Sequence, residues 1–151
     1  MIGHKINDTK EALKFMFAGK SIFTFINTKT GNRFTYKIKS NKDSNLFFVS
    51  VLTNPDNYSY IGTCIEGNYR HGKKSNISPE AQSVKVFQFM LNKLKSNNLP
   101  DFLEVWHEGF CGKCGRRLTV PSSILTGIGP ECFKTLSKAE KRDKFLELIL
   151  S

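Results

Sequence analysis

Three cysteines and one histidine near the end of the chain have the residue types and spacing of a metal site. Cys111 and Cys114 form a Cys-x-x-Cys pair, which lets two sulfurs on one tight turn reach a single tetrahedral ion. Gly112 and Gly115 follow the two cysteines, and glycine permits the unusual backbone angles of a metal-binding knuckle. Cys132 follows a Gly-Pro-Glu sequence that can begin a short helix and aim a third sulfur at the knuckle. The pattern predicts three thiolate ligands for zinc.

A structural zinc ion takes four ligands, and the sequence leaves the fourth open. Thr135 stands where a second Cys-x-x-Cys pair would place its last cysteine. His107 lies four residues before the knuckle, whereas Cys64 lies far upstream in an apolar segment that also suits a buried thiol. We expect His107, with Cys64 or water as alternatives. The expected ligands of this structural Zn²⁺ are His107, Cys111, Cys114 and Cys132.

Other chemistry is less well supported by the sequence. A redox Cys-x-x-Cys pair is the competing interpretation, but the flanking glycines and the third cysteine favour metal. A zinc deaminase needs a His-x-Glu pair with Pro-Cys-x-x-Cys, and neither is present. Asp56 and Glu66 are conceivable nuclease carboxylates, but Asn68 stands where such a site would place a lysine. We therefore expect no enzymatic activity.

The charge balance favours an anionic partner. The chain has 23 Lys and Arg against 13 Asp and Glu, a formal net charge of +10, spread over both halves of the sequence. Such a charge also simply promotes solubility. The cations near the knuckle can offset the charge of the thiolates or bind phosphates. The candidate nucleic-acid-binding residues are Arg70, Lys73, Lys74, Lys113, Arg116 and Arg117.

The elements that must position these residues follow from hydrophobic periodicity. Thr9 is a candidate cap for a helix over residues 9–18. Alternating or apolar runs predict strands over 21–27, 33–39, 46–52 and 58–65, arranged as a meander. Residues 66–77 are expected to form an exposed basic loop.

The second half of the chain contains the longest predicted helix. Ser78, Pro79 and Glu80 have the cap, first-turn proline and first-turn acid of a helix start, and an apolar stripe continues to about residue 95. A strand is expected over 102–107. Residues 137–150 are expected to form a final helix that packs onto its own domain or anchors a partner.

These elements predict an α+β protein. Its N-terminal antiparallel sheet packs with a long helix, and a small C-terminal zinc-knuckle module, treble-clef-like and helical, follows. The expected division is a sheet domain over 1–106 and a zinc-binding module over 107–151, packed as one unit. No apolar run reaches the length of a membrane helix and no secretory signal is evident, so we expect a cytoplasmic protein.

The segment from Cys111 to Cys132 reads Cys-x-x-Cys-Gly-Arg-x-Leu-Thr-x-Pro-x-Ser-Ile-x-x-Gly-Ile-Gly-Pro-x-Cys and resembles the DUF6011 family found in bacteriophages and mobile elements. The similarity extends upstream through His107 to residues 51–57, which resemble a Leu-Thr-Gly-Pro-Asp-Asn arrangement of phage proteins, with Asn54 in place of the glycine. The resemblance implies a zinc-binding module in a phage or plasmid accessory protein, and the family name supplies no activity.

Two functions fit these observations. The first is a noncatalytic, zinc-stabilised phage accessory protein that binds DNA or RNA through its basic surfaces. The alternative is a phage-encoded protein that binds a host transcription, replication or defence component and inhibits or redirects it. Neither function requires a membrane or a small-molecule substrate, and both take place in the cytoplasm of a bacterial host.

Overall fold

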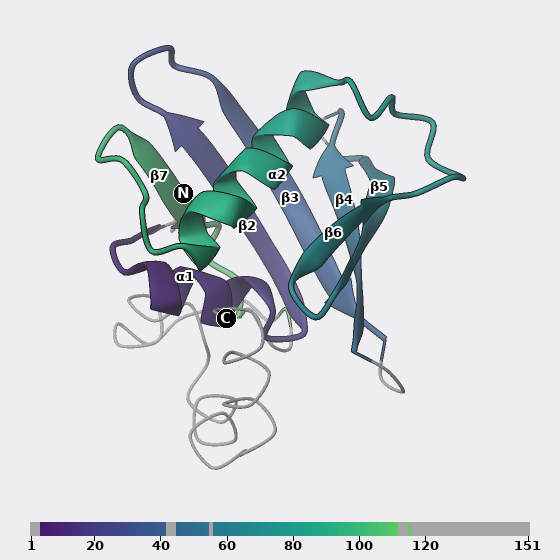
Figure 1. Ribbon diagram of the computed structural model, residues 1–151, viewed down its shortest axis with the longest axis horizontal. Helices are drawn as coiled ribbons and strands as arrows, with labels where there is room; N and C mark the ends of the chain where they lie inside the picture. Colours follow the sequence, from purple (N-terminus) through teal and green to yellow (C-terminus); the bar gives the residue numbers. More distant parts are fainter. Residues whose placement is uncertain (1–3, 42–44, 55, 112–114, 116–151) are drawn as a thin grey trace.

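A computed structural model describes residues 4–41, 45–54, 56–111 and 115 of the chain (Figure 1). Seven strands and two helices make up this part. In chain order they are β1 (His4–Ile6), α1 (Thr9–Met16), β2 (Lys20–Asn27), β3 (Arg33–Ser40), β4 (Leu46–Leu52), β5 (Tyr58–Ile65), β6 (Asn68–His71), α2 (Gln82–Lys95) and β7 (Leu103–His107).

All seven strands form one antiparallel sheet in the order β1-β7-β2-β3-β4-β5-β6. The strands from β2 to β6 follow one another as a meander, because each is joined to the next by a short connection. The last described strand, β7, returns to pair with β2 and takes β1 on its other side. The two ends of the described chain therefore meet at one edge region of the sheet.

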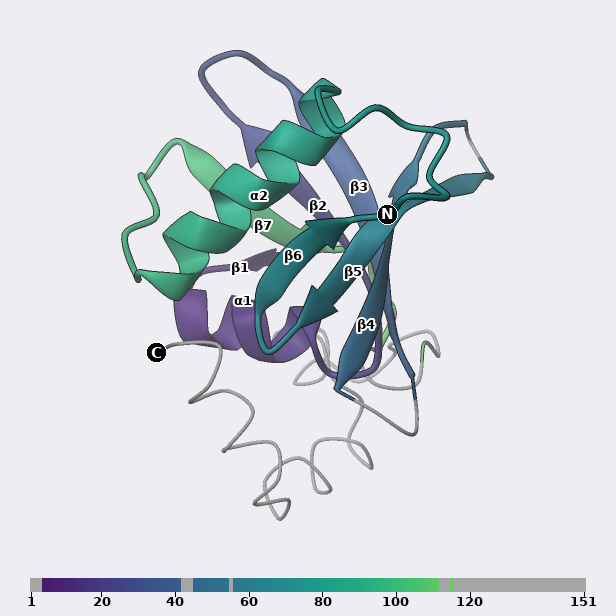
Figure 2. The same cartoon turned by 45° about the vertical axis from the view of Figure 1, so that its right-hand side comes forward.

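Side-chain alternation gives the sheet two different faces. In β3, Tyr36 and Ile38 are fully buried on one face, while Lys37 and Lys39 project from the other. Both helices lie on the first face, as the two views of the ribbon show (Figures 1 and 2). We call this the helix face, and the opposite one the open face.

The core lies between the helices and the helix face. Phe87 of α2 packs against Phe25 and Tyr36, with ring centroids 6.2 and 5.2 Å apart. The Tyr36 hydroxyl donates to the Ser83 carbonyl at 2.7 Å, so the one polar atom of this buried ring is satisfied. Burial raises the pKa of Tyr36 well above its ordinary value. The cluster therefore fixes α2 on the sheet with both packing and a hydrogen bond.

The expected α+β architecture is wrong. The described chain is dominated by a single seven-stranded antiparallel sheet, and its two helices have only 8 and 14 residues. β7 lies inside this sheet, between β1 and β2, and the described residues contain no group of three or more potential metal ligands. The predicted helix over 137–150 lies outside the described residues. Long-range pairing of β7, which local periodicity does not encode, accounts for the difference.

Three local predictions also need correction. The longest helix begins at Gln82, and Ala81 provides no side-chain cap, so the signals at Ser78 to Glu80 belong to the turn before it. Asp8, not Thr9, caps α1 by accepting from the Glu11 amide at 3.2 Å. The predicted basic loop contains β6.

A tight turn explains why β6 forms within the predicted loop. Glu66 and Gly67 have φ angles of 52° and 78°, and they join β5 to β6 so that Ile65 pairs with Asn68. Two consecutive positive φ angles match the right-handed twist of a two-residue hairpin. Gly67 supplies one of them without strain. This turn brings Arg70 into the sheet.

Of the helices in the part of the chain that the structure describes, none is both long enough and apolar enough to cross a membrane.

Gly62 is a sensitive position of the sheet, because β5 and β6 approach each other too closely there for a side chain. A Cβ atom at Gly62 would lie 2.2 Å from the Arg70 carbonyl oxygen and 2.7 Å from the Tyr69 hydroxyl. We expect Gly62→Ala to lower the free energy of unfolding by about 2–4 kcal/mol, measured by urea denaturation.

Gly31→Ala is the matched control for this substitution. A Cβ atom at Gly31 meets nothing within 4 Å, although its φ of 79° disfavours alanine. We expect a loss of only about 1 kcal/mol. An equal or larger loss at Gly31 would show that backbone conformation, and not the close approach of β6, makes Gly62 necessary.

Candidate metal centre and nucleic-acid interface

His107 is the last residue of β7 and is fully buried. It pairs with His4 of β1 on one side and Phe23 of β2 on the other. Its ring centroid lies 5.7 Å from that of Phe15 and 6.1 Å from that of His4. The imidazole is therefore held in a narrow space at the end of the core, beside the segment that leads to the knuckle.

One ring nitrogen of His107 faces that segment. The Gly109 amide donates to Nδ1 at 3.0 Å, so in the neutral ring the hydrogen is on Nε2. Zinc coordination through Nδ1 would replace this hydrogen bond, and coordination through Nε2 would require the other tautomer. Losing one buried hydrogen bond costs about 1–3 kcal/mol, whereas zinc in such sites contributes about 10–16 kcal/mol. The hydrogen bond from Gly109 is therefore too weak to prevent His107 from binding zinc.

The first knuckle cysteine is also buried, and it begins a tight turn. The Gly115 amide donates to the Cys111 carbonyl at 2.8 Å, and Gly115 has a φ of 79°. A Cβ atom at Gly115 would lie 3.2 Å from Cδ of Lys20, so the turn packs against the side chain of the first residue of β2. The other two predicted ligands, Cys114 and Cys132, lie outside the described residues.

Cys64 occupies a different part of the sheet. It is buried in β5, four strands away from β7, so about 19 Å separates the two strands in the direction of their hydrogen bonds. Cys64 and His107 therefore cannot bind the same ion. Burial raises the pKa of the Cys64 thiol to about 12, which keeps it protonated at neutral pH. Cys64 has the properties of a core thiol.

The two carboxylates considered for a nuclease site do not meet. Asp56 precedes β5 and Glu66 follows it, so an eight-residue strand, about 26 Å long, separates them. Both side chains are exposed. A shared metal ion between Asp56 and Glu66 is excluded by this geometry.

The open face carries a row of basic side chains, which the strand registers align. Lys20 pairs with Lys39, Lys39 with Phe48, Phe48 with Thr63 and Thr63 with Arg70. We call these five residues the basic row. It crosses five strands and spans about 19 Å. All three of its cations are exposed, and none of them forms an ion pair with another described residue.

Aromatic rings lie among these cations. Phe48 is 39% exposed in the middle of the basic row, and its ring centroid is 6.4 Å from that of Tyr60. In the neighbouring rows Lys37 lies over the Tyr58 ring, with Nζ 5.3 Å from the centroid. An exposed aromatic ring surrounded by cations is the arrangement that binds unpaired bases and phosphates together.

Two acidic side chains of the open face come from β7 or directly follow it: Glu104 and Glu108. Glu108 accepts a hydrogen bond from the Thr24 hydroxyl, which in turn accepts one from Thr35 at 2.7 Å. Burial raises the pKa of the nearby Tyr58, and the Glu108 charge adds to the effect. The carboxylate of Glu108 is thus held by Thr24 of β2, and it lies close enough to Tyr58 of β5 to affect the pKa of that residue.

Glu104, also on this side, is neutralised by its neighbours. Its carboxylate accepts from Trp106 Nε1 at 3.0 Å and lies 3.3 Å from Lys5 Nζ. The hydrogen bond from Trp106, together with the Lys5 charge, lowers the pKa of Glu104. The negative charge of Glu104 is therefore paired with the positive charge of Lys5.

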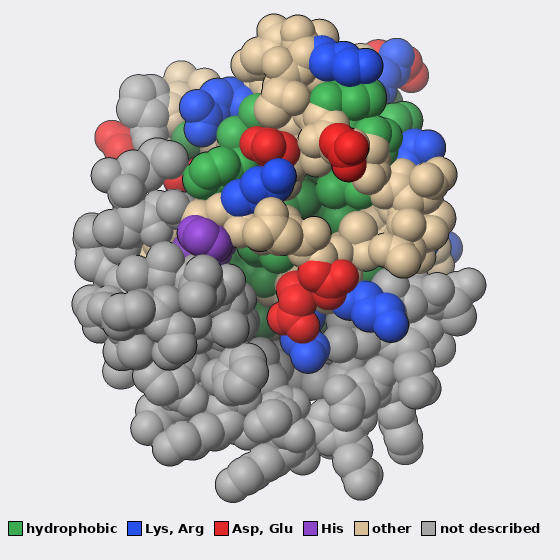
Figure 3. Space-filling model, turned by 90° about the vertical axis from the view of Figure 1, so that its left-hand side faces the viewer, with side chains coloured by type: hydrophobic (Ala, Val, Ile, Leu, Met, Phe, Trp, Pro, Cys, Tyr) green, Lys and Arg blue, Asp and Glu red, His purple; other side chains and the backbone are tan. Residues whose placement is uncertain are grey.

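The structure places three of the six predicted nucleic-acid-binding residues. Arg70 belongs to the basic row, and Lys73 and Lys74 are exposed just after β6. The other three, Lys113, Arg116 and Arg117, lie outside the described residues. A view of one side of the molecule shows basic and acidic groups intermixed, so positive charge does not dominate every surface (Figure 3).

Sequence reasoning missed the cations on the strands. The alternation of apolar and polar residues in β2 and β3 could have predicted that Lys20, Lys37 and Lys39 project from the open face, because every second side chain of a half-buried strand faces outward. Phe48 was hidden in an apolar run, where exposure cannot be read from periodicity. The register between strands, which aligns these residues, requires the structure.

Cys64 should resist alkylation in the folded protein. Because burial raises its pKa to about 12, we expect labelling by iodoacetamide at pH 8 to be roughly a thousandfold slower than in urea. Peptide mass mapping measures the labelling. The raised pKa of Cys64 also makes stability depend on pH. Because the thiol ionises at lower pH in the unfolded chain than in the folded one, the free energy of unfolding falls as pH rises from about 8.5 towards 12. Rapid labelling of the native protein would contradict this burial.

Comparison with known proteins gives one match. Neither a curated protein nor a solved structure matches the chain. Residues 103–137, which begin with β7 and include the four predicted zinc ligands, match the family described as "Family of unknown function (DUF6011)".

Proposed function

We propose that this protein is a noncatalytic nucleic-acid-binding protein that holds single-stranded DNA or RNA on the open face of its sheet. The observation that carries the proposal is the basic row, in which Lys20, Lys39 and Arg70 flank the exposed ring of Phe48. Cations on both sides of an aromatic ring allow the phosphates and a base of one strand to bind together.

The shape of the open face supports single strands over duplexes. In the described part of the chain both helices cover the other face, and the basic row lies on pleated strands (Figure 2). Duplex readout uses an element that enters a groove, whereas unpaired bases stack on sheet-borne aromatic rings. Phe48 and Tyr60 provide such rings, and Lys37 extends the positive charge beside them.

We also propose a structural zinc ion held by His107, Cys111, Cys114 and Cys132. Three thiolates and an imidazole leave no position for a reactive water, so the ion serves folding. The turn at Cys111 rests on Lys20, the first member of the basic row. In the sequence, Lys113 lies within this turn and Arg116 and Arg117 directly follow it, which supports a continuous binding surface.

The resemblance of the knuckle to a family of phages and mobile elements supports an accessory role. In this proposal the protein acts in the cytoplasm of a bacterial host. Binding without cleavage agrees with the separation of Asp56 from Glu66 by the whole length of β5.

Cys114→Ser should release the metal, because three ligands hold zinc far more weakly than four. We expect one zinc per chain in the wild-type protein by elemental analysis, and less than about a tenth of that in the variant. His107→Ala should lose zinc in the same way if the imidazole is the fourth ligand.

Cys64→Ala is the control, since this cysteine lies four strands from β7. It should keep its zinc. Chelation should then expose three cysteines to alkylation in the wild-type protein while Cys64 stays protected. Full zinc content in Cys114→Ser, or its loss in Cys64→Ala, would refute the ligand set.

Phe48→Ala should weaken binding of a fluorescein-labelled 15-nucleotide oligo(dT) or oligo(U) by about 5- to 150-fold in fluorescence anisotropy, since stacking contributes about 1–3 kcal/mol per base. Phe89→Ala is the matched control, because Phe89 is 50% exposed on α2, away from the open face. It should leave the affinity unchanged. A 15-base-pair duplex should show little dependence on Phe48.

Lys39→Glu combined with Arg70→Glu should weaken the same binding and flatten its salt dependence. Neutralising two phosphate contacts on a single strand changes the slope of log affinity against log salt by about 1.4. The control Lys29→Glu with Lys93→Glu changes the net charge equally but lies outside the basic row. Equal losses in the two double variants would show that overall charge, and not the open face, attracts nucleic acid.

A further inference from the structure

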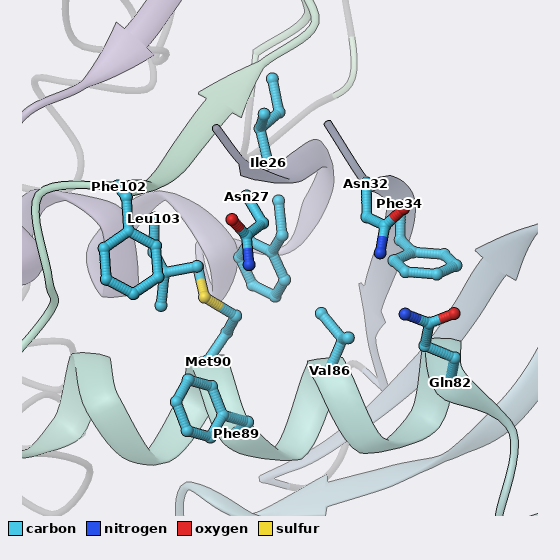
Figure 4. A pocket seen from close by; sticks show the side chains of 11 residues that line it. Ile26, Asn27, Asn32, Phe34, Gln82, Val86, Phe89, Met90, Phe102 and Leu103 are labelled. Carbon is cyan, nitrogen blue, oxygen red and sulfur yellow. The ribbon is translucent and has the colours of Figure 1, made fainter. Parts of the chain in front are cut away.

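A second candidate binding site lies on the helix face. An apolar pocket of about 190 Å³ opens between α2 and the β2–β3 hairpin (Figure 4). Phe25 and Phe34 line it from the sheet, and Val86 and Met90 line it from the helix. No charged residue is among the lining residues that the structure describes. The pocket therefore presents an apolar surface to whatever enters it.

The size of the pocket limits its ligand. Sites for cofactors and drug-sized molecules occupy about 300–1,000 Å³, so this pocket is too small for them. It is large enough for one aromatic or aliphatic side chain. Insertion of a single apolar anchor into such a pocket is typical of a protein interface, where a few buried side chains carry most of the affinity.

The mouth of the pocket carries three amide side chains. Asn27 Oδ1 accepts from the backbone amides of Lys29 and Thr30 at 3.0 and 3.3 Å, which leaves the Asn27 NH₂ group for a ligand. The amides of Asn32 and Gln82 lie on the other side of the opening (Figure 4). Amide groups can pair with the N–H and C=O groups of a peptide backbone. They favour a peptide over a hydrocarbon ligand.

Two lysines give this site a positive charge. Lys29 Nζ lies 4.0 Å from the centroid of the Phe102 ring, and Lys93 Nζ lies 5.4 Å from that of Phe89. Both rings line the pocket, and neither lysine forms an ion pair with another described residue. An acidic segment lying across the opening would meet a cation at each of these rings.

We infer that this pocket docks an acidic segment of a partner protein, which inserts one apolar side chain between α2 and the hairpin. Gln82, Val86, Phe89 and Lys93 follow a single stripe of α2, with spacings of four, three and four residues, so the segment can contact the helix along its length. The site is independent of the basic row, because it lies on the opposite side of the sheet. A nucleic-acid strand suits this pocket less well than an acidic peptide, because two lysines beside the opening cannot contact a long series of phosphates.

The test uses a seven-residue peptide with a central phenylalanine flanked on each side by three acidic residues. In a ¹H–¹⁵N NMR titration of the full chain, we expect saturable shifts of the Asn32, Val86 and Phe89 amides. Phe89→Ala, and Lys29→Glu with Lys93→Glu, should each weaken binding at least about tenfold. Replacing the central phenylalanine of the peptide by alanine should have a similar effect. All three substituted residues are at the surface, and the spectrum itself reports whether each variant folds.

Lys39→Glu with Arg70→Glu is the matched control, because it makes the same change in net charge on the open face. It should leave peptide affinity within about twofold. Three results would overturn the inference by showing charge attraction alone. They are equal weakening by both double variants, equal binding of the alanine peptide, and shifts confined to the basic row. The inference would also fail if the peptide does not saturate below about 1 mM, or if oligo(dT) shifts the pocket amides at lower concentration than the peptide.

Discussion

Pairing of β7 with β2 is the constraint on which the rest of this molecule depends. It joins Leu103–His107 to residues of a strand that begins at Lys20, and it closes a long segment that includes four strands and α2. Ordering so long a loop is costly in entropy, and the core contacts of Leu103 and Val105 offset it. The same pairing places His107 beside Phe15 and directs the chain back along β2, where the turn from Cys111 to Gly115 meets Lys20. One set of backbone hydrogen bonds thus positions His107 and brings the turn at Cys111 next to Lys20, the first residue of the basic row.

The sheet separates two kinds of surface by side-chain alternation alone. Neighbouring residues of β3 show this: Tyr36 donates its hydroxyl to α2 in the core, while Lys37 lies over the Tyr58 ring on the opposite face. A one-residue slip of this strand would exchange the two environments. The close approach at Gly62 and the turn at Glu66 set the position of β6, and through it the position of Arg70. Features that look purely structural therefore determine where the charges of the proposed binding surface lie.

Local sequence patterns predicted the individual strands better than their arrangement. The strict alternation of β3 and the apolar run of β4 were sufficient to locate both strands. The short β1 and β6 were missed, since three or four residues carry too little periodicity, and the polar residues around Arg70 resembled a loop. The start of α2 was placed too early because Ser78 and Pro79 favour a helix start but form a preceding turn instead. Pairing between strands that are distant in the sequence separates Cys64 from His107. The same kind of pairing aligns Lys20, Lys39 and Arg70, so no short stretch of sequence predicts either arrangement.

The hydrogen bond from the Gly109 amide fixes the orientation of the His107 ring, and the proposed zinc ion would have to compete with it. The amide holds Nδ1 and orients the ring towards the chain that carries Cys111, at a cost to metal binding of only a few kcal/mol if it is displaced. The proposed zinc would contribute several times more, so this cost does not prevent zinc binding. Since the adjoining turn rests on Lys20, an ion bound there would also fix one end of the basic row. In this proposal the metal takes no part in catalysis. It would assist nucleic-acid binding by restricting the motion of Lys20, whose charge contacts a phosphate.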